Sequence, residues 1–392
     1  MYFAIGPRAV PLSARTRSLR LPSLYQFSVL PSLPFYRPQN SPRKANHYSQ
    51  RFVSTSSVFT STSAPAVGQQ PLPMGSQLKS PLDKCYIIDE VLSERPAAGR
   101  VWCVYRATHK GKQFILKDII PGDFDYIISL QKHVKDSPHV RTAVDNIPER
   151  HILVFPYLEK GLLHVDTAAL SPVAKKGIVR DALTGLADLH DKHIIHTDIK
   201  PTNIMMDSIK QQNGDLGWCN VQITDLEAAV VLPPKAKGLT DRLSGNQYWR
   251  SPEAWARGIQ NTPSDIYSFA IVAIFAWTGR MVFFSDEANR ATPEEQADLI
   301  LRRHLSYFAS EMEDVEGFIA YHGGDDNPFV KRVKELLCTF SEKDPRLPFG
   351  RWQQVDPQFR DLVCKMTCMD PSRRITAREA LLHPWFAGER SS

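Results

Sequence analysis

The sequence predicts an α+β fold with two unequal parts, a small β-rich region followed by a larger helical one. Short apolar and β-branched runs between residues 85 and 158 are typical of strands. Beyond residue 170, long stretches follow helical spacing instead. Strands gathered first and helices afterwards indicate an α+β arrangement.

The individual elements can be assigned in chain order. Three strands come first, and a helix follows in which Phe124, Ile127 and Val134 keep helical spacing. One more strand precedes the long helices. The expected ranges are strands at 85–92, 101–107, 113–118 and 151–158, and helices at 173–190, 265–277 and 293–308.

The first 81 residues have a different composition. Residues 1–80 contain nine Lys and Arg residues and no Asp or Glu, and residues 1–81 hold 11 prolines. Such a segment buries too little apolar surface to offset its ordering entropy, so it is expected to be disordered. Its Arg-rich, Ser-rich and acid-free composition is typical of a mitochondrial transit peptide. The alternative is a plain basic extension of a cytoplasmic or nuclear protein.

The rest of the chain is close to neutral. Nine of the 48 basic residues lie in the first 80, and the other 39 face all 42 acidic ones. The net charge of +6 therefore belongs to the tail and does not indicate nucleic-acid binding. The longest apolar run, near 269–277, is shorter than the ~18 residues that span a bilayer, so no membrane segment is expected. The six cysteines lack the spacing of a zinc site.

The densest chemical signal is the segment 196–203, which reads HTDIKPTN. Asp198 at its centre can accept the proton of a substrate hydroxyl, and Lys200 can neutralise charge on a migrating phosphoryl group. Asn203, five residues after the Asp, can hold a metal ion. The segment resembles the catalytic loop of protein kinases, H-R-D-x-K-x-x-N, and Lys200 in particular resembles the serine/threonine class.

Further motifs occur in the order and at the distances found in protein kinases. The stretch D-L-E at 225–227 follows an apolar strand and occupies the place of D-F-G. The stretch S-P-E at 251–253 occupies the place of A-P-E. The series ends with SDIYSF, DPSRRITA and LHPWF at 264–269, 370–377 and 382–386.

The resemblance covers residues 82–388. It implies a two-lobed protein kinase fold, with a β-rich N-lobe near 82–156 and a helical C-lobe near 159–388, preceded by the tail. Within the motifs, the detailed amino-acid sequence resembles that of a divergent serine/threonine kinase-like group of filamentous fungi.

The same resemblance implies a role for each candidate residue. Asp198 would be the general base, and Lys117, at the end of the third strand, would clamp the phosphates together with Lys200. Asn203 and Asp225 would bind the Mg²⁺ that bridges the phosphates of ATP. The other nucleotide-binding residues would lie in the glycine-rich loop, in the strand after it and in the hinge between the lobes: Gly99, Val101, Phe155 as the gatekeeper, and Tyr157.

Four further residues are expected to be structural. His196 would bond the neighbouring metal-binding turn, and Asp265 would tie down the catalytic-loop backbone. Glu253 and Arg374 would form a buried ion pair, which costs about 3–5 kcal/mol to break when one partner is removed.

Three departures from the family pattern bear on activity. Glu94 and Pro96 stand at the first two glycine positions of the G-x-G-x-x-G loop, where glycines let the backbone close over the phosphates. The helix after the third strand lacks an evident Glu to pair with the strand lysine, and Asp125 or Tyr126 stands near the expected position. Glu227 replaces the glycine of D-F-G; a solvated side chain is expected there, with an extra metal ligand as the alternative.

Thr197 replaces the Arg that normally receives a phosphorylated activation loop. The protein is therefore expected not to require loop phosphorylation, although Thr240 and Ser244 lie in that loop.

Acidic runs recur between residues 281 and 330. They are expected to form a solvated surface, and a docking site for a basic partner is the sharper alternative.

The function expected from the sequence is transfer of the γ-phosphate of Mg-ATP to serine or threonine hydroxyls of a protein substrate. A pseudokinase scaffold that acts through partners is the alternative. The three departures favour the scaffold, and the retention of Lys117, Asp198, Asn203 and Asp225 opposes it. A small-molecule kinase is a third option, which the S-P-E and HPWF segments disfavour.

Overall fold

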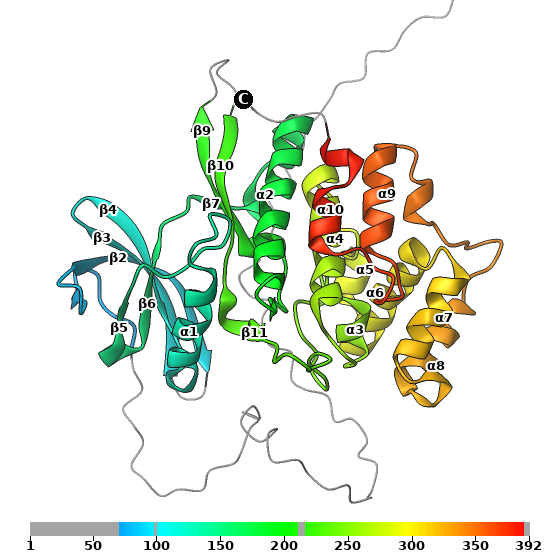
Figure 1. The fold of residues 1–392 in the computed structure, drawn as a ribbon, viewed down its shortest axis with the longest axis horizontal. Helices are drawn as coiled ribbons and strands as arrows, with labels where there is room; N and C mark the ends of the chain where they lie inside the picture. The colour runs from blue at the N-terminus through cyan, green and yellow to red at the C-terminus, as the bar shows by residue number, and fades with distance from the viewer. Residues whose placement is uncertain (1–69, 98–99, 211–215, 388–392) are drawn as a thin grey trace, which may run out of the picture. The chain divides into compact units, whose positions relative to one another are not determined.

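The computed structural model describes residues 70–97, 100–210 and 216–387. Residues 1–69 of the predicted disordered segment, 1–81, lie outside these ranges, whereas Gln77–Lys79 of that segment form a strand, so the prediction of disorder is wrong there. The β-rich part is a six-stranded antiparallel sheet with the strand order β1-β2-β3-β4-β6-β5 (Figure 1). Its strands are β1 (Gln77–Lys79), β2 (Cys85–Ala97), β3 (Arg100–His109), β4 (Lys112–Asp118), β5 (Asp145–Ile147) and β6 (Ile152–Pro156).

Helix α1 (Phe124–Val134) follows β4 and covers one face of this sheet. Phe124 and Ile127, three residues apart on the helix, form a buried cluster with Ile119 and Leu153. Leu153 is directly opposite Lys117 in the β4–β6 ladder, and opposed residues project to the same side. Lys117 therefore projects from the face of the sheet that α1 covers.

The other face of the sheet carries the core of the β-rich part. Leu116 alternates with Lys117 along β4, so it projects to this opposite face. It packs in a buried cluster with Tyr86, Cys103 and Tyr105. The two faces thus separate the apolar core from the side on which Lys117 lies.

The helical part is built around α4 (Thr262–Thr278), whose residues are buried from Asp265 to Ala276. A helix that is apolar on all sides can only be stable at the centre of a core. The Asn261 side chain caps its first turn, and Gly279 ends it in a left-handed conformation with φ 71°. The other helices are α2 (Pro172–His190), α3 (Pro252–Trp255), α5 (Asp286–Arg290), α6 (Pro293–Phe308), α7 (Met312–Tyr321), α8 (Pro328–Leu337), α9 (Pro357–Met366) and α10 (Ala377–Leu381).

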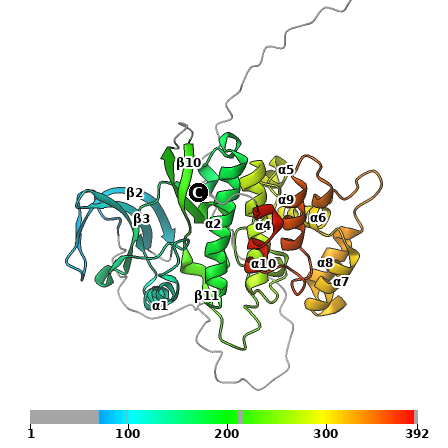
Figure 2. The same cartoon turned by 45° about the horizontal axis from the view of Figure 1, so that its top comes forward.

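Two small sheets lie beside α2 and position the functional loops (Figure 2). One contains β7 (Lys160–Gly161), β9 (Ile204–Lys210) and β10 (Leu216–Ile223), and the other pairs β8 (Ile194–Ile195) with β11 (Val230–Val231). The catalytic-loop segment therefore lies between β8 and β9, and the D-L-E turn lies between β10 and β11.

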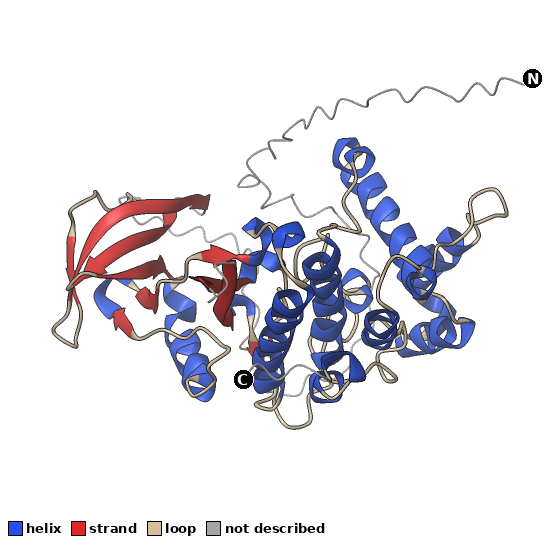
Figure 3. Ribbon diagram, turned by 90° about the horizontal axis from the view of Figure 1, so that it is seen from above, coloured by secondary structure: helices blue, strands red, loops and turns tan. Residues whose placement is uncertain are grey.

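The predicted fold class is confirmed, because the sheet region comes first along the chain and most of the helices follow. Figure 3 shows most strands gathered at one end of the view and most helices at the other. The sheet begins earlier than the expected start at residue 82, because β1 pairs with β2 and buries Leu78. A strand of three residues is too short to reveal an alternation in the sequence. Within the described ranges, no helix combines the length and apolar character needed to cross a membrane.

Candidate active site

A buried carboxylate fixes the backbone of the catalytic-loop segment. Asp265, in the first turn of α4, accepts hydrogen bonds from the backbone N–H of His196 at 2.7 Å and of Thr197 at 2.9 Å. Thr197 has a φ of 65°, a conformation that non-glycine residues keep only when their surroundings impose it. The predicted anchoring role of Asp265 is confirmed.

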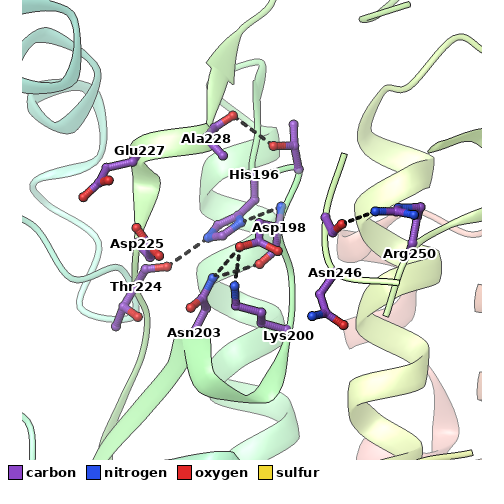
Figure 4. Close-up of polar contacts among 12 residues, drawn as sticks. His196, Asp198, Lys200, Asn203, Thr224, Asp225, Glu227, Ala228, Asn246 and Arg250 are labelled. Atoms are coloured by element: carbon purple, nitrogen blue, oxygen red, sulfur yellow. Dashed lines mark hydrogen bonds and ion pairs between the residues drawn. The ribbon is translucent and has the colours of Figure 1, made fainter. Parts of the chain in front are cut away.

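The ring of His196 is fully buried and connects the catalytic loop with the D-L-E turn (Figure 4). Its Nε2 lies 3.0 Å from the carbonyl oxygen of Thr224, and its Nδ1 lies 3.3 Å from the backbone nitrogen of Asp198. A carbonyl can only accept and an N–H can only donate, so the proton is assigned to Nε2. His196 therefore has the structural role that was predicted for it.

Asp198, Lys200 and Asn203 form one hydrogen-bonded group (Figure 4). Nζ of Lys200 lies 2.6 Å from Oδ2 of Asp198. The side-chain amide of Asn203 donates to the Asp198 carbonyl oxygen at 2.9 Å and to Oδ2 at 3.4 Å. Since Oδ2 has these two partners, Oδ1 is the carboxylate oxygen better placed to accept a substrate proton.

Asp225 approaches this group from the sheet side and is paired with Lys117. Oδ1 of Asp225 lies 2.8 Å from Nζ of Lys117. Burial alone would raise the pKa of Asp225, but Lys117, followed by Lys200 and His196, holds it at about 2. For Lys117, burial alone would lower the pKa, but the neighbouring carboxylates of Asp225 and Glu227 outweigh burial and raise the pKa above its ordinary value. Both groups are therefore charged at neutral pH.

Glu227 is the second partner of Lys117. Its Oε1 lies 2.5 Å from Nζ of the lysine, and its side chain is 38% exposed. Burial raises the pKa of Glu227 above its ordinary value and Asp225 adds to the rise, although Lys117 opposes it. This ion pair with Lys117 was not predicted from the sequence, and a role of Glu227 as an extra metal ligand stays a prediction.

Helix α1 is attached to the site through a tyrosine. The hydroxyl of Tyr126 accepts a hydrogen bond from the backbone N–H of Val231 at 3.1 Å and lies 3.4 Å from the carbonyl oxygen of Ala229. Asp125 is exposed and forms no ion pair among the residues that the structure describes. Of the two candidates on this helix, Tyr126 therefore faces the D-L-E segment, and the lysine takes its carboxylate from Glu227 instead.

Where the glycine-rich loop was predicted, β2 and β3 stay paired from Ser93 to Ala97. Pro96 pairs with Val101, and Arg95 pairs with Trp102. Because Val104 is directly opposite Lys117, alternation places Trp102 on the face of Lys117 and Val101 on the other face. Val101 packs against the core cluster that contains Leu116. Gly99 lies outside the described residues.

This register brings a cation to the site that the sequence did not reveal. Arg95 projects to the same side as Trp102, and its charge acts on the Glu227 carboxylate. Arg100 stacks on Trp102, with its guanidinium carbon 4.2 Å from the ring centroid. The position of Arg95 and Trp102 follows from the strand register with Lys117, which counting glycine positions in the sequence does not give.

The predicted hinge residues Phe155 and Tyr157 lie on either side of Pro156, the last residue of β6. Phe155 is directly opposite Ile115, so it projects to the face of Lys117. Tyr157 comes directly after β6 and is partly buried. Their proposed contact with a nucleotide base stays a prediction.

Contacts to backbone groups hold the activation segment beside the catalytic loop. Oγ1 of Thr197 donates to the carbonyl oxygen of Ala228 at 2.9 Å. The buried guanidinium of Arg250 donates to the carbonyl oxygens of Ser244 at 2.8 Å and Gly245 at 2.6 Å. Gly245 has a φ of 73°, and a Cβ there would lie 3.1 Å from the Thr197 carbonyl oxygen.

The donor set of Asn203 and Asp225 fits Mg²⁺, which prefers carboxylate and carbonyl oxygens. Both amide hydrogen bonds of Asn203 go to Asp198 (Figure 4). The backbone nitrogen of Thr224 also donates to the Asn203 carbonyl oxygen of the main chain at 2.9 Å, which holds the two loops together. These two residues would hold the cation.

The acidic region between 281 and 330 is partly neutralised within the chain. Arg373 pairs with Glu313 at 3.3 Å and with Asp314 at 2.8 Å, and Lys334 pairs with Asp325. The expected docking of a basic partner on this region stays a prediction.

Comparison with known proteins agrees with this geometry. Residues 115–386 match the protein kinase domain family. The chain is also similar to the serine/threonine-protein kinase srb10 of Schizosaccharomyces pombe, with 28% identity over 254 residues. That alignment covers 61% of this chain and 64% of the relative, so the chain spans less than two thirds of the length of this curated relative. The family match covers well over half of the chain, and the protein therefore belongs to the protein kinase family.

Proposed function

We propose that this protein kinase transfers the γ-phosphate of Mg-ATP to serine or threonine hydroxyls of a protein substrate. The observation that carries the proposal is a continuous set of contacts through the four residues that handle phosphate and metal. Lys117 pairs with Asp225 at 2.8 Å, and the neighbouring Thr224 bonds the backbone of Asn203 at 2.9 Å. Asn203 in turn bonds Asp198.

The chemistry assigned to the residues follows from this arrangement. Oδ1 of Asp198 accepts the hydroxyl proton as the substrate oxygen forms its bond to the γ-phosphorus. The bond between the γ-phosphorus and the oxygen bridging it to the β-phosphate breaks, and ADP leaves with that electron pair. Lys117 and Lys200 stabilise negative charge on the phosphates from two sides. When bound, Mg²⁺ neutralises charge on the β- and γ-phosphate oxygens.

The proposal that serine and threonine are the acceptor residues rests on Lys200 and on the similarity to the S. pombe relative. Lys200 stands two residues after Asp198, as in the serine/threonine class, and its Nζ is held 2.6 Å from that carboxylate. The printed name of the S. pombe relative is that of a serine/threonine-protein kinase. Both observations support hydroxyl acceptors on aliphatic side chains.

A pseudokinase scaffold is the second candidate, and one observation favours it. Strands β2 and β3 stay paired up to Ala97 and Arg100, with Pro96 in the ladder. Proline has no N–H to offer a phosphate, so Pro96 cannot contribute the backbone donor that a glycine at this position of a glycine-rich loop provides. The placement of Arg95 on the face of Lys117 counters this, because a guanidinium can bind phosphate through its side chain.

The full chain, Mg²⁺ and γ-labelled ATP would test the proposal with a mixture of generic protein substrates, followed by phosphoamino-acid analysis. Label in phosphoserine or phosphothreonine that disappears with Asp225→Asn supports the kinase. A folded protein that transfers no label above this variant would support the scaffold. Label confined to phosphotyrosine would contradict the serine/threonine assignment.

A further inference from the structure

A buried arginine lies among the residues predicted to hold the nucleotide base. Arg141 is 8% exposed, and its backbone nitrogen donates to the carbonyl oxygen of Ile223 at 2.8 Å, which fixes its position behind the hinge. Its Nε lies 2.9 Å from the carbonyl oxygen of Pro156, and its NH2 donates to the same oxygen. Pro156 lies between Phe155 and Tyr157, so the guanidinium takes a backbone acceptor of the hinge itself.

The guanidinium of Arg141 also lies near Phe155 of the hinge and near Met205, which follows the catalytic loop. Its carbon lies 5.3 Å from the ring centroid of Phe155. Its NH1 lies 3.9 Å from Sδ of Met205, two residues after Asn203. Burial lowers the pKa of Arg141 to about 10, with Asp207 and Asp225 opposing the change, so the group keeps its charge at neutral pH.

The hydrogen-bonding chemistry of this position discriminates between bases. In the arrangement that the resemblance to protein kinases implies, adenine would present its amino group, a donor, to the Pro156 carbonyl. Two donors of Arg141 already use that carbonyl, and a guanidinium has no acceptor to offer in exchange. A purine with a carbonyl oxygen in place of the amino group would meet a donor instead, the pairing that arginine makes with guanine.

We propose that Arg141 is a specificity-determining residue of the nucleotide site, which disfavours a base with an amino group at the hinge relative to one with a carbonyl there. The proposal rests on the proposed nucleotide-dependent function and deepens it. It identifies a competitor for the hinge carbonyl that would weaken ATP binding, in addition to the altered β2–β3 hairpin.

ATP and inosine triphosphate are the matched probes, because they share the ribose and triphosphate and differ in the base edge that carries the amino or carbonyl group. Dissociation constants of both would be measured by calorimetry on the full chain with Mg²⁺. The ratio of the dissociation constant of inosine triphosphate to that of ATP isolates the contribution of the base to affinity. Effects of a substitution on triphosphate binding change both constants equally and cancel in the ratio. Arg141→Met is expected to raise this ratio by about tenfold or more, as loss of hydrogen bonds to a charged group implies.

Three controls make the result interpretable. Arg141→Lys keeps the charge with fewer directed donors, so the ratio should fall between those of the wild type and Arg141→Met. Arg150→Met removes an exposed arginine of the same lobe and should leave the ratio unchanged. Thermal unfolding of each variant shows that binding is compared between folded proteins.

An unchanged or lowered ratio in folded Arg141→Met would overturn the proposal. If the wild type transferred phosphate in that case, the kinase function would stand and only the role of Arg141 would fall. If no variant bound either nucleotide, the specificity proposal and the nucleotide-dependent function would both be overturned.

Discussion

Nζ of Lys117 lies closer to Oε1 of Glu227, at 2.5 Å, than to Oδ1 of Asp225, at 2.8 Å. The residue that replaces the glycine of D-F-G thus provides the partner that the helix α1 does not. Glu227 lies on the D-L-E turn, two residues after Asp225, and not on the helix. Lys117 therefore takes both of these carboxylate partners from the D-L-E turn.

Replacing Glu227 by Gln should lower kcat/KM for ATP by about 10- to 100-fold, because a charge-assisted hydrogen bond to the lysine is lost. Asp125→Asn makes the same carboxylate-to-amide change on the exposed side of α1 and should change kcat/KM by less than about twofold. Glu227→Asp keeps the charge and should recover part of the loss. Steady-state kinetics at several ATP concentrations would measure all three. A large loss with Asp125→Asn and none with Glu227→Gln would show that α1 supplies the partner after all.

Glu253→Gln should destabilise the fold by about 3–5 kcal/mol, since it leaves the buried charge of Arg374 without its counterion. The two side chains are 1% and 0% exposed and make two parallel contacts, at 2.8 and 3.0 Å. Urea unfolding would measure the change. The exposed Asp325–Lys334 pair is the matched control, and Asp325→Asn should cost no more than about 1 kcal/mol. Equal costs for the two substitutions would argue against the burial of the Glu253 pair.

Activity should not depend on phosphorylation of the activation segment. Thr197 and Arg250 hold that segment through backbone carbonyls, so no phosphate is needed to order it. Treatment of the purified full chain with a phosphatase should leave the phosphotransfer rate unchanged, with the phosphorylation state followed by mass spectrometry. Arg250→Met should lower the rate, because the carbonyls of Ser244 and Gly245 lose their donor. A large loss of activity on phosphatase treatment would contradict this account.

Stability should fall as the pH is lowered, in part because of His304. This ring is 2% exposed, its Nδ1 lies 2.7 Å from the hydroxyl of Tyr267, and burial lowers its pKa to about 3. The unfolded chain, with an ordinary histidine pKa of about 6.5, binds the proton more readily. The stabilisation is therefore fully present above about pH 6.5 and is lost toward pH 3, with a slope of about 1.4 kcal/mol per pH unit.

The variant His304→Asn keeps an acceptor for Tyr267 but has no titratable group. Its unfolding free energy, measured by urea at several pH values, should vary with pH less steeply than that of the wild type between about pH 6.5 and 3. Parallel curves for the two proteins would show that His304 is not the group responsible.

Local sequence patterns were sufficient to predict much of the fold and part of the site. Helix α6 was predicted at 293–308, and the structure has Pro293–Phe308, because Pro at its start and its apolar spacing are local signals. The contacts of Asp198, Lys200 and Asn203 also lie within a few residues of one another, so the motif implies them.

Contacts between distant segments could not be predicted in the same way. The pairing of Lys117 with Glu227 joins residues 110 positions apart, and no local pattern distinguishes it from a solvated glutamate. Arg141 follows the mostly polar stretch D-S-P-H-V at 136–140, where a surface charge is the ordinary expectation, yet its side chain reaches Pro156. The side of the sheet on which Arg95 and Trp102 lie depends on the register with Lys117, and the sequence does not contain that register.

The most direct test of the account is the rate at which the full chain incorporates labelled phosphate from Mg-ATP into protein, with wild type and Asp198→Asn prepared and assayed side by side. The substitution keeps the size of the side chain and removes the carboxylate that would accept the hydroxyl proton. The account predicts incorporation by the wild type and a loss of about 10²- to 10⁴-fold in the variant, at an unchanged unfolding temperature. Equal rates for the two proteins would contradict the central claim that Asp198 is the base of a working kinase.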